Sequence, residues 1–278
     1  MFGRRLLAGV LASLFVGQAG AEPLPLPHSI VFYYGENPVL NELSRFQLAV
    51  LEPDSGFSPR DIPPCETIWF AYVSVGEVSP HRPYYQAMPK NWIIGRNAEW
   101  HSDIIDQTAK GWPQFFVDHV IAPLWERGYR GFFLDTMDTY ELVAPEEFQK
   151  QRNRQGLVAV IRAIRARYPE AALIMNRGFE LLPAVHGELY ALAFESLFRG
   201  WSEAEGRYTK VSAEDRAWLM QEVRRARQDY GLPVIAIDYC KPTDSLCSRE
   251  VAHRIRQLGM VPYIGDGRLQ TVNLAVLP

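Results

Sequence analysis

The sequence lacks the motifs of several common enzyme classes. It has only three cysteines and six histidines among 278 residues, with no His-Glu-x-x-His segment and no cysteine pair at zinc-site spacing. A zinc hydrolase would therefore lack its ligands. Gly-x-Ser-x-Gly, the Gly-Lys-Ser/Thr phosphate loop and Gly-x-Gly-x-x-Gly are also absent, which argues against serine esterases, nucleotide hydrolases and dinucleotide enzymes. The sequence predicts no metal and no cofactor.

Excess positive charge and long apolar runs are also missing. The net charge is -3 and the pI is about 6.1, so we expect no long-range attraction for nucleic acid or anionic lipid. Beyond the first residues, no stretch approaches the ~20 apolar residues that a membrane helix needs. The sequence therefore predicts a soluble product that binds neither nucleic acid nor a membrane.

The amino terminus has the pattern of an export signal. Two arginines precede an apolar run at residues 6–16, and small residues at 19–21 form a cleavage pattern. We expect residues 1–21 to be a signal peptide and the product to be periplasmic or extracellular; an uncleaved anchor is the alternative. Residues 22–278 contain no linker, repeat or low-complexity tract, which predicts one domain.

Short apolar runs rich in β-branched and aromatic residues alternate with amphipathic helical patterns along most of the chain. The expected strands are residues 30–34, 46–51, 68–75, 131–135, 172–176, 189–195, 234–239 and 261–264. The clearest expected helices are residues 113–127, 146–167, 213–230 and 248–258. This alternation is typical of parallel strands with right-handed crossovers. Eight such strands predict an α/β fold with a single (β/α)8 TIM-type barrel.

Two features lie outside this alternation. Residues 78–108 contain no clear helix, and we expect them to form a long excursion over the barrel mouth rather than to add a barrel strand at 103–106. In an exported protein, Cys240 and Cys247 can close a short loop as a disulfide, which would leave Cys65 free and buried.

Acidic and aromatic residues end or follow nearly every predicted strand. The carboxyl ends of TIM-barrel strands form the catalytic face, so these positions define a candidate site. Its expected members are Tyr34, Tyr72, Glu77, Asp135, Asp138, Tyr140, Asn176, Glu195, Asp238 and Tyr239. The alternative is that acids after strands cap helices or form turns, which suits Asp138 well. It suits Asp135 and Glu195 poorly, because each directly follows an apolar run and would be partly buried unless it faces a cavity.

A pair of carboxyl groups in unlike surroundings can cleave a glycosidic bond. One must hold a proton for the leaving oxygen, and the other must be ionised. Glu195 is flanked by Phe194 and Leu197, which favours a raised pKa. Asp135, with the polar Thr136 beside it, is the better candidate for the ionised partner.

Residues 71–77, 132–140, 176–179 and 237–239 resemble the signature segments of glycoside hydrolase family 114, the endo-α-1,4-polygalactosaminidases. The likeness runs in order from about residue 31 to residue 264. It is strongest to the family members that form the hydrolase region of a polysaccharide-modifying protein.

The family resemblance implies specific roles for residues already in the candidate site. It implies that Asp135 and Glu195 are the catalytic carboxylates. An Asp after the fourth strand and an acid after the sixth also resemble the arrangement of retaining α-galactosidases, and that analogy implies Asp135 as nucleophile and Glu195 as acid/base. The family resemblance also implies that a substrate groove contains Tyr34, Glu77, Asp138, Asn176 and Asp238.

The resemblance therefore implies an endo-acting hydrolase of α-1,4 bonds in a galactosamine/N-acetylgalactosamine exopolysaccharide. The ring of acids is suited to such a polymer, because deacetylated galactosamine is cationic. Aromatic residues of the excursion, Trp92 and Trp100 among them, are expected to stack on sugar rings. The alternative is a non-catalytic carbohydrate-binding barrel of an exopolysaccharide export system. The oligomeric state is left open.

Overall fold

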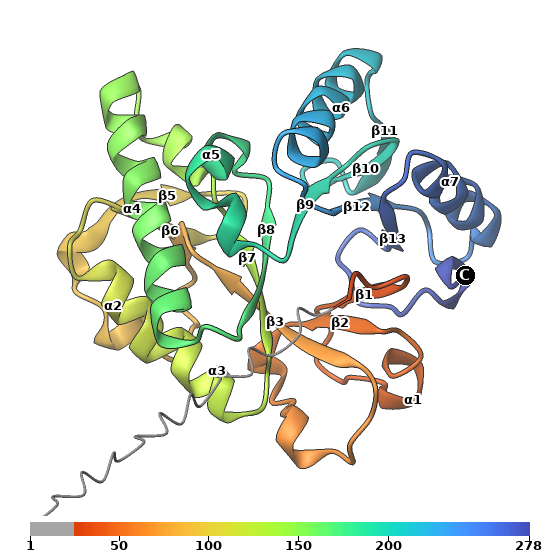
Figure 1. Ribbon diagram of the computed structural model, residues 1–278, viewed down its shortest axis with the longest axis horizontal. Coiled ribbons are helices and arrows are strands. Elements are labelled where there is room, and N and C mark those ends of the chain that lie inside the picture. Colours follow the sequence, from red (N-terminus) through yellow and green to blue (C-terminus); the bar gives the residue numbers. More distant parts are fainter. Residues whose placement is uncertain (1–24) are drawn as a thin grey trace, which may run out of the picture.

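The computed structural model describes residues 25–278, so the expected signal peptide lies outside the described residues. Eight parallel strands form one sheet in the order β1-β2-β3-β7-β8-β9-β12-β13. They are β1 (Ile30–Tyr33), β2 (Leu48–Leu51), β3 (Ile68–Ser74), β7 (Gly131–Asp135), β8 (Ala172–Asn176), β9 (Ala191–Glu195), β12 (Val234–Tyr239) and β13 (Val261–Gly265). The sheet curls until β13 comes beside β1 (Figure 1), which makes a nearly closed barrel and confirms the predicted TIM-type architecture.

Side chains on β1 and β13 hold the two ends of the sheet together. The Tyr263 hydroxyl donates to the carbonyl of Phe32 at 2.9 Å, and the two rings lie 5.5 Å apart. Inside the barrel, Phe32 also contacts Phe133 edge-on at 5.0 Å. At the start of β7, a Cβ on Gly131 would lie 2.3 Å from the Phe70 ring, so only glycine leaves room for that ring. Packed aromatic side chains therefore fill the barrel interior.

The helices lie outside the sheet (Figure 1). They are α1 (Leu40–Leu43), α2 (Trp112–Phe116), α3 (Ala122–Glu126), α4 (Glu147–Arg167), α5 (Leu182–Val185), α6 (Ala213–Gln228) and α7 (Ser245–Gln257). All four clearly predicted helices are present. The long helix α4 buries Leu157, Ile161 and Ile164 on one face, at the spacing expected of an amphipathic helix.

Two of the predicted helices differ in detail from expectation. The helix expected at 113–127 is divided into α2 and α3 by a π-helical turn at Val117–Ile121. Pro123 follows this turn, and a proline ring inside a helix displaces the carbonyl four residues earlier, which accounts for the wider turn. Helix α7 begins earlier than expected because the Asp244 side chain accepts from the Cys247 amide at 2.9 Å and caps it.

Two small antiparallel sheets were not predicted. One has the order β4-β6-β5 and consists of β4 (Glu77–Val78), β5 (Ile93–Asn97) and β6 (Ser102–Ile105). The other is the hairpin of β10 (Arg199–Ser202) and β11 (Arg207–Lys210). Residues 103–106 thus add no strand to the barrel, as expected, but most of that segment does form a strand within the excursion.

The cysteines are only partly as expected. Cys240 and Cys247 form a disulfide, with their Cα atoms 6.2 Å apart. Cys65 is free but exposed, so the prediction that it is buried was wrong. It follows two prolines in the irregular segment before β3, which runs over the surface. Within residues 25–278, every helix is too short or too polar to cross a bilayer.

Candidate active site

A cleft of about 660 Å³ lies at the carboxyl ends of the barrel strands. It is lined by side chains at or just after the ends of β1, β2, β3, β7, β9, β12 and β13, from the 78–108 excursion and from the turn between β10 and β11. Those discussed below are Tyr34, Glu52, Tyr72, Glu77, Arg82, Glu99, Trp100, Asp135, Thr136, Glu195, Glu203, Tyr239 and Arg268. The cleft therefore occupies the position at which TIM barrels carry their active sites.

Asp135 and Glu195, which line this cleft, share hydrogen bonds with one buried amide group. The Asn176 side-chain nitrogen donates to Oδ1 of Asp135 at 2.8 Å and to Oε1 of Glu195 at 3.3 Å. Two oxygens that share one nitrogen at these distances lie at most roughly 6 Å apart, which is close to the ~5–5.5 Å of retaining glycosidases and below the ~6.5–9.5 Å of inverting ones.

Each carboxylate also has a tyrosine of its own. The Tyr72 hydroxyl donates to Oδ2 of Asp135 at 2.8 Å, and the Tyr239 hydroxyl donates to Oε2 of Glu195. Burial and the neighbouring carboxylates raise the pKa of both tyrosines well above the usual value, so both hydroxyls stay protonated and donate. Tyr34 packs against Tyr72 with ring centroids 4.9 Å apart.

The surroundings of Glu195 favour its protonated form. Burial, and after it the negative charge of Asp135, raise its pKa to about 7. The hydrogen bonds from Tyr239 and Asn176 and the charge of Arg177 act in the opposite direction. A carboxylic acid with a pKa near 7 can donate a proton at neutral pH.

The backbone just beyond Asp135 adopts an unusual conformation. Thr136 has a φ of 62°, in the left-handed region that β-branched residues rarely enter. Its hydroxyl accepts from the Gly76 amide at 2.8 Å, and a Cβ on Gly76 would lie 2.2 Å from the Thr136 carbonyl oxygen. Arg177, just after Asn176, has a φ of 56°. Strained residues of this kind cluster at functional sites.

Glu77 lines the cleft, but its oxygens are already bonded. It is 3% exposed and accepts from Asn97 at 3.0 Å, from Thr139 at 2.8 Å and from the Ser102 hydroxyl. Asn97 and Ser102 belong to β5 and β6, so Glu77 anchors the excursion to the mouth of the barrel.

Four of the expected site residues do not line the cleft. Asn176 is buried outside the lining, although it bonds both carboxylates. Tyr140 is 3% exposed, and its hydroxyl accepts from Arg154 at 3.0 Å within the packed core. Asp138 lies 3.8 Å from Arg177 outside the lining. Asp238 is 0% exposed and points away from the cleft. Neighbouring strand residues point to opposite faces, so Tyr239 and Asp238 cannot both face the substrate.

The sequence reasoning missed two arginines among the cleft residues. Arg82 pairs with Glu52 at 2.5 Å, and Arg268 pairs with Glu203 at 2.5 Å. These partners are 30 and 65 residues apart in the chain, so no local pattern reveals them. Within residues 25–278, Glu99 has no ion pair. The cleft is therefore less strongly acidic than its list of carboxylates indicates.

The two tryptophans of the excursion have different positions. Trp100 lines the cleft and is 60% exposed, which is compatible with contact to a ligand. Trp92 packs edge-on against Trp112 and Phe115, with ring centroids 6.1 and 5.6 Å apart. Trp92 is thus a packing residue.

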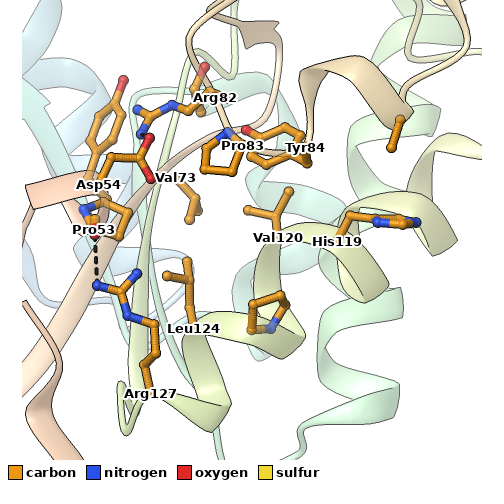
Figure 2. Close-up of a pocket in the computed structure, with 14 residues that line it drawn as sticks. Pro53, Asp54, Val73, Arg82, Pro83, Tyr84, His119, Val120, Leu124 and Arg127 are labelled. Carbon is orange, nitrogen blue, oxygen red and sulfur yellow. Dashed lines mark hydrogen bonds and ion pairs between the residues drawn. The ribbon is translucent and has the colours of Figure 1, made fainter. Parts of the chain in front are cut away.

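A second hollow of about 320 Å³ lies between β3 and α3 (Figure 2). Val73, Val120 and Leu124 give it an apolar floor, and Arg127 at one end donates to the Pro53 carbonyl at 2.8 Å. Neither Asp135 nor Glu195 lines it. The paired carboxylates therefore distinguish the larger cleft as the candidate active site. Residues 25–278 contain no group of three or more His, Cys, Asp or Glu side chains placed to hold a metal ion.

Both a family model and a solved structure identify this chain as similar to glycoside hydrolases. The model of glycoside-hydrolase family GH114 matches residues 19–276. The glycoside hydrolase domain of PelA from Pseudomonas aeruginosa has a similar structure, with a TM-score of 0.81 and 33% identity over 90% of this chain and 98% of that chain.

The chain also has two more distant similarities. Aspergillus fumigatus Ega3, solved in complex with galactosamine, has a TM-score of 0.59 and 12% identity over 87% of this chain and 91% of that chain, which shows a shared fold. An uncharacterised Deinococcus radiodurans protein is 26% identical over 73% of this chain and 66% of its own length. The chain belongs to glycoside hydrolase family GH114 and is a glycoside hydrolase.

Proposed function

We propose that this chain is an exported, endo-acting hydrolase of α-1,4 bonds in an exopolysaccharide of galactosamine and N-acetylgalactosamine, and that residues 22–278 form its catalytic domain. The observation that carries the proposal is the sharing of one Asn176 amide by Asp135 and Glu195 at the barrel mouth. Export agrees with the Cys240–Cys247 disulfide, because disulfides persist in oxidising compartments.

In the proposed first step, Asp135 attacks the anomeric carbon while Glu195 transfers its proton to the leaving glycosidic oxygen. The bond from that carbon to the leaving oxygen breaks, and an ester between the sugar and Asp135 forms. Tyr72 and Asn176 hold the two Asp135 oxygens, which orients the carboxylate for attack.

In the second step Glu195 acts as a base. Once Asp135 is an ester its negative charge is gone, and one cause of the raised pKa of Glu195 goes with it. The lowered pKa lets Glu195 take a proton from a water molecule, whose oxygen attacks the anomeric carbon and releases Asp135. Two displacements at one carbon retain its configuration, as the short separation of the carboxylates favours.

The charge of the cleft supports a cationic or partly N-acetylated polymer. Glu52 and Glu203 are neutralised by arginines, and Glu77 is occupied by hydrogen bonds. The negative charges left for a sugar ammonium group are chiefly those of Asp135 and Glu99. We expect such recognition at one or two sugar units rather than along the whole cleft.

The test is to incubate the purified chain with partly deacetylated α-1,4-galactosamine polymer and to follow reducing ends and polymer length. We expect early fragmentation into mid-length products, with the α anomer formed first in the proton NMR spectrum. Glu195→Gln should stop the cutting. Glu188→Gln, a matched change just before β9 at the opposite end of that strand, should not.

The rival function is binding without cleavage. If both the unaltered chain and Glu195→Gln retain the polymer but neither releases reducing ends, the chain acts on another bond or only binds. Initial formation of the β anomer would exclude retention.

A further inference from the structure

Asp238 lies behind the wall of the cleft, on the other side of β12 from the catalytic pair. It is 0% exposed. Its Oδ1 accepts from the Leu197 amide at 2.6 Å, and its Oδ2 accepts from the amides of Phe198 and Arg199 at 2.7 and 2.8 Å. A single carboxylate thus receives three successive backbone amides that begin two residues after Glu195.

This set of bonds requires an ionised carboxylate. All three partners are donors, so an acid proton or an amide nitrogen at this position would face another donor. The pKa of Asp238 is raised to about 6 because the effect of burial exceeds the opposing effects of the three amides and of the Arg254 charge. Asp238 is therefore charged at neutral pH and forms charge-assisted bonds, which are stronger than neutral ones.

Strand β12 consequently holds Glu195 from two sides. Tyr239 donates directly to the Glu195 carboxylate inside the cleft, and Asp238 fixes the backbone that follows Glu195 outside it. No other side chain bonds the amides of residues 197–199 within residues 25–278.

We propose that Asp238 is a positioning residue for the acid/base Glu195: it holds residues 197–199 in place and thereby sets where the Glu195 carboxyl meets the glycosidic oxygen. The inference rests on the proposed roles of Asp135 and Glu195. A shift of about 1 Å in a catalytic group costs on the order of 10²-fold in rate, so loss of this support should lower activity without touching the substrate.

The test compares substrates that do and do not need an acid. Aryl glycosides of a galactosamine oligosaccharide with a poor and a good leaving group are cleaved by the unaltered chain, Asp238→Asn and Glu195→Gln. With the poor leaving group we expect Asp238→Asn to lower kcat about 10–100-fold with little change in KM. With the good leaving group in single-turnover glycosylation the loss should be less than about threefold, because departure no longer requires a proton.

Controls separate this role from general damage. Asp244→Asn alters another Asp after β12, which accepts a backbone hydrogen bond at the start of α7. It should change the cleavage rate of neither substrate. If Asp238→Asn lowers the activity on both substrates equally, the proposal is overturned, because a partly unfolded enzyme loses activity on both substrates alike. If Glu195→Gln itself shows no leaving-group dependence, the proposed function fails instead.

A second measurement covers the case in which Asp238→Asn does not fold. Hydrogen exchange in the unaltered protein should be slow at the amides of residues 197–199. Exchange there as fast as in the exposed turn of β10 and β11 would contradict the three bonds. Asp238→Glu keeps the charge but moves the oxygens, and it should show the same leaving-group pattern as Asp238→Asn; normal activity on both substrates would overturn the role.

Discussion

The strand ends that carry the two carboxylates have the same kind of direct partners but different support behind them. Asp135 and Glu195 each accept one tyrosine hydroxyl, and they share the Asn176 amide. Behind Asp135, the chain turns through left-handed Thr136, whose hydroxyl is bonded by the Gly76 amide. Behind Glu195, a buried carboxylate holds the backbone. The two carboxylates are thus held alike at their oxygens and differently in the backbone that follows them.

The comparison teaches how two acids acquire different tasks in one cleft. The burial of Glu195 and the charge of Asp135 bring its pKa to about 7, where donating and accepting a proton are both feasible. In the proposed mechanism Asp135 attacks the anomeric carbon, which needs a fixed orientation rather than a shared proton. Substitutions at Asp135 and its supporting groups should therefore give different kinetic defects from substitutions at Glu195 and its supporting groups.

The largest effect should come from removing either carboxylate. Glu195→Gln should lower polymer cleavage about 10²–10⁴-fold, the range typical of lost general acid catalysis. Asp135→Asn should lower it at least as much. An activated aryl leaving group should restore the glycosylation step only in Glu195→Gln, as seen in burst kinetics. Equal restoration in both variants would mean that the two roles have been assigned wrongly.

A smaller effect should distinguish the two tyrosines through the pH profile of kcat/KM. Activity should fall as pH rises through about 7, because Glu195 loses the proton that it donates. Tyr239→Phe removes a hydrogen bond that lowers the pKa of Glu195, so it should move this alkaline limb to higher pH. Tyr72→Phe removes a bond to Asp135 and should chiefly lower the plateau.

At each pH, the kcat/KM of the variant is divided by the kcat/KM of the unaltered chain. Ionisation of the substrate amines then cancels, because both enzymes act on the same polymer. An alkaline limb that moves to lower pH in Tyr239→Phe would contradict the assignment of Glu195 as the acid.

The raised pKa of Glu195 also has a consequence for stability. A carboxyl with a raised pKa in the folded state holds its proton more tightly than in the unfolded state, so its favourable contribution is complete below its unfolded pKa and is lost as pH rises toward about 7. Above pH 7 the folded protein must therefore bury an ionised Glu195, which costs stability, and Glu195→Gln removes that cost. The variant should gain about 1–3 kcal/mol over the unaltered chain at pH 8 and little at pH 4.

Urea unfolding at the two pH values measures this difference. Glu188→Gln serves as the control, because the carboxyl it removes lies at the other end of β9, away from the cleft. Equal stability of Glu195→Gln and the unaltered chain at pH 8 would show that burial of Glu195 is not costly.

The smallest effect should be that of salt. Contacts between exposed charges are largely screened beyond ~10 Å at 0.1 M salt. Cleavage of deacetylated polymer should therefore slow a few-fold between low and high salt, whereas cleavage of fully N-acetylated polymer should not. Glu99→Gln should reduce the salt dependence. Equal salt effects on both polymers would argue against recognition of the sugar amine by charge.

Much of the barrel could be predicted from the sequence because each strand and helix repeats a local pattern. Strands β7, β8 and β12 begin and end as expected, since each is a short apolar run between polar residues. Asp135 and Glu195 were also placed correctly at one end of the barrel. This placement follows from the parallel arrangement, because the carboxyl ends of parallel barrel strands lie at the same end of the barrel.

The remaining features depend on long-range packing. Tyr140 and Asp238 were expected in the cleft, and both are buried away from it. A strand's sequence shows that neighbours alternate, but which face receives the ligand is decided by the helices packed outside. The pairing of Arg82 with Glu52 likewise joins segments distant in the chain, so local patterns do not reveal it.

The most direct test of the two-carboxylate mechanism is mass spectrometry of Glu195→Gln after mixing with an aryl galactosaminide oligosaccharide that has a good leaving group. Without its acid/base the second step is slow, so the glycosyl-enzyme should accumulate. The mechanism predicts one added glycosyl group on the peptide that contains Asp135. An adduct on another residue, or polymer cleavage by the unaltered chain with inverted products and no adduct, would contradict it.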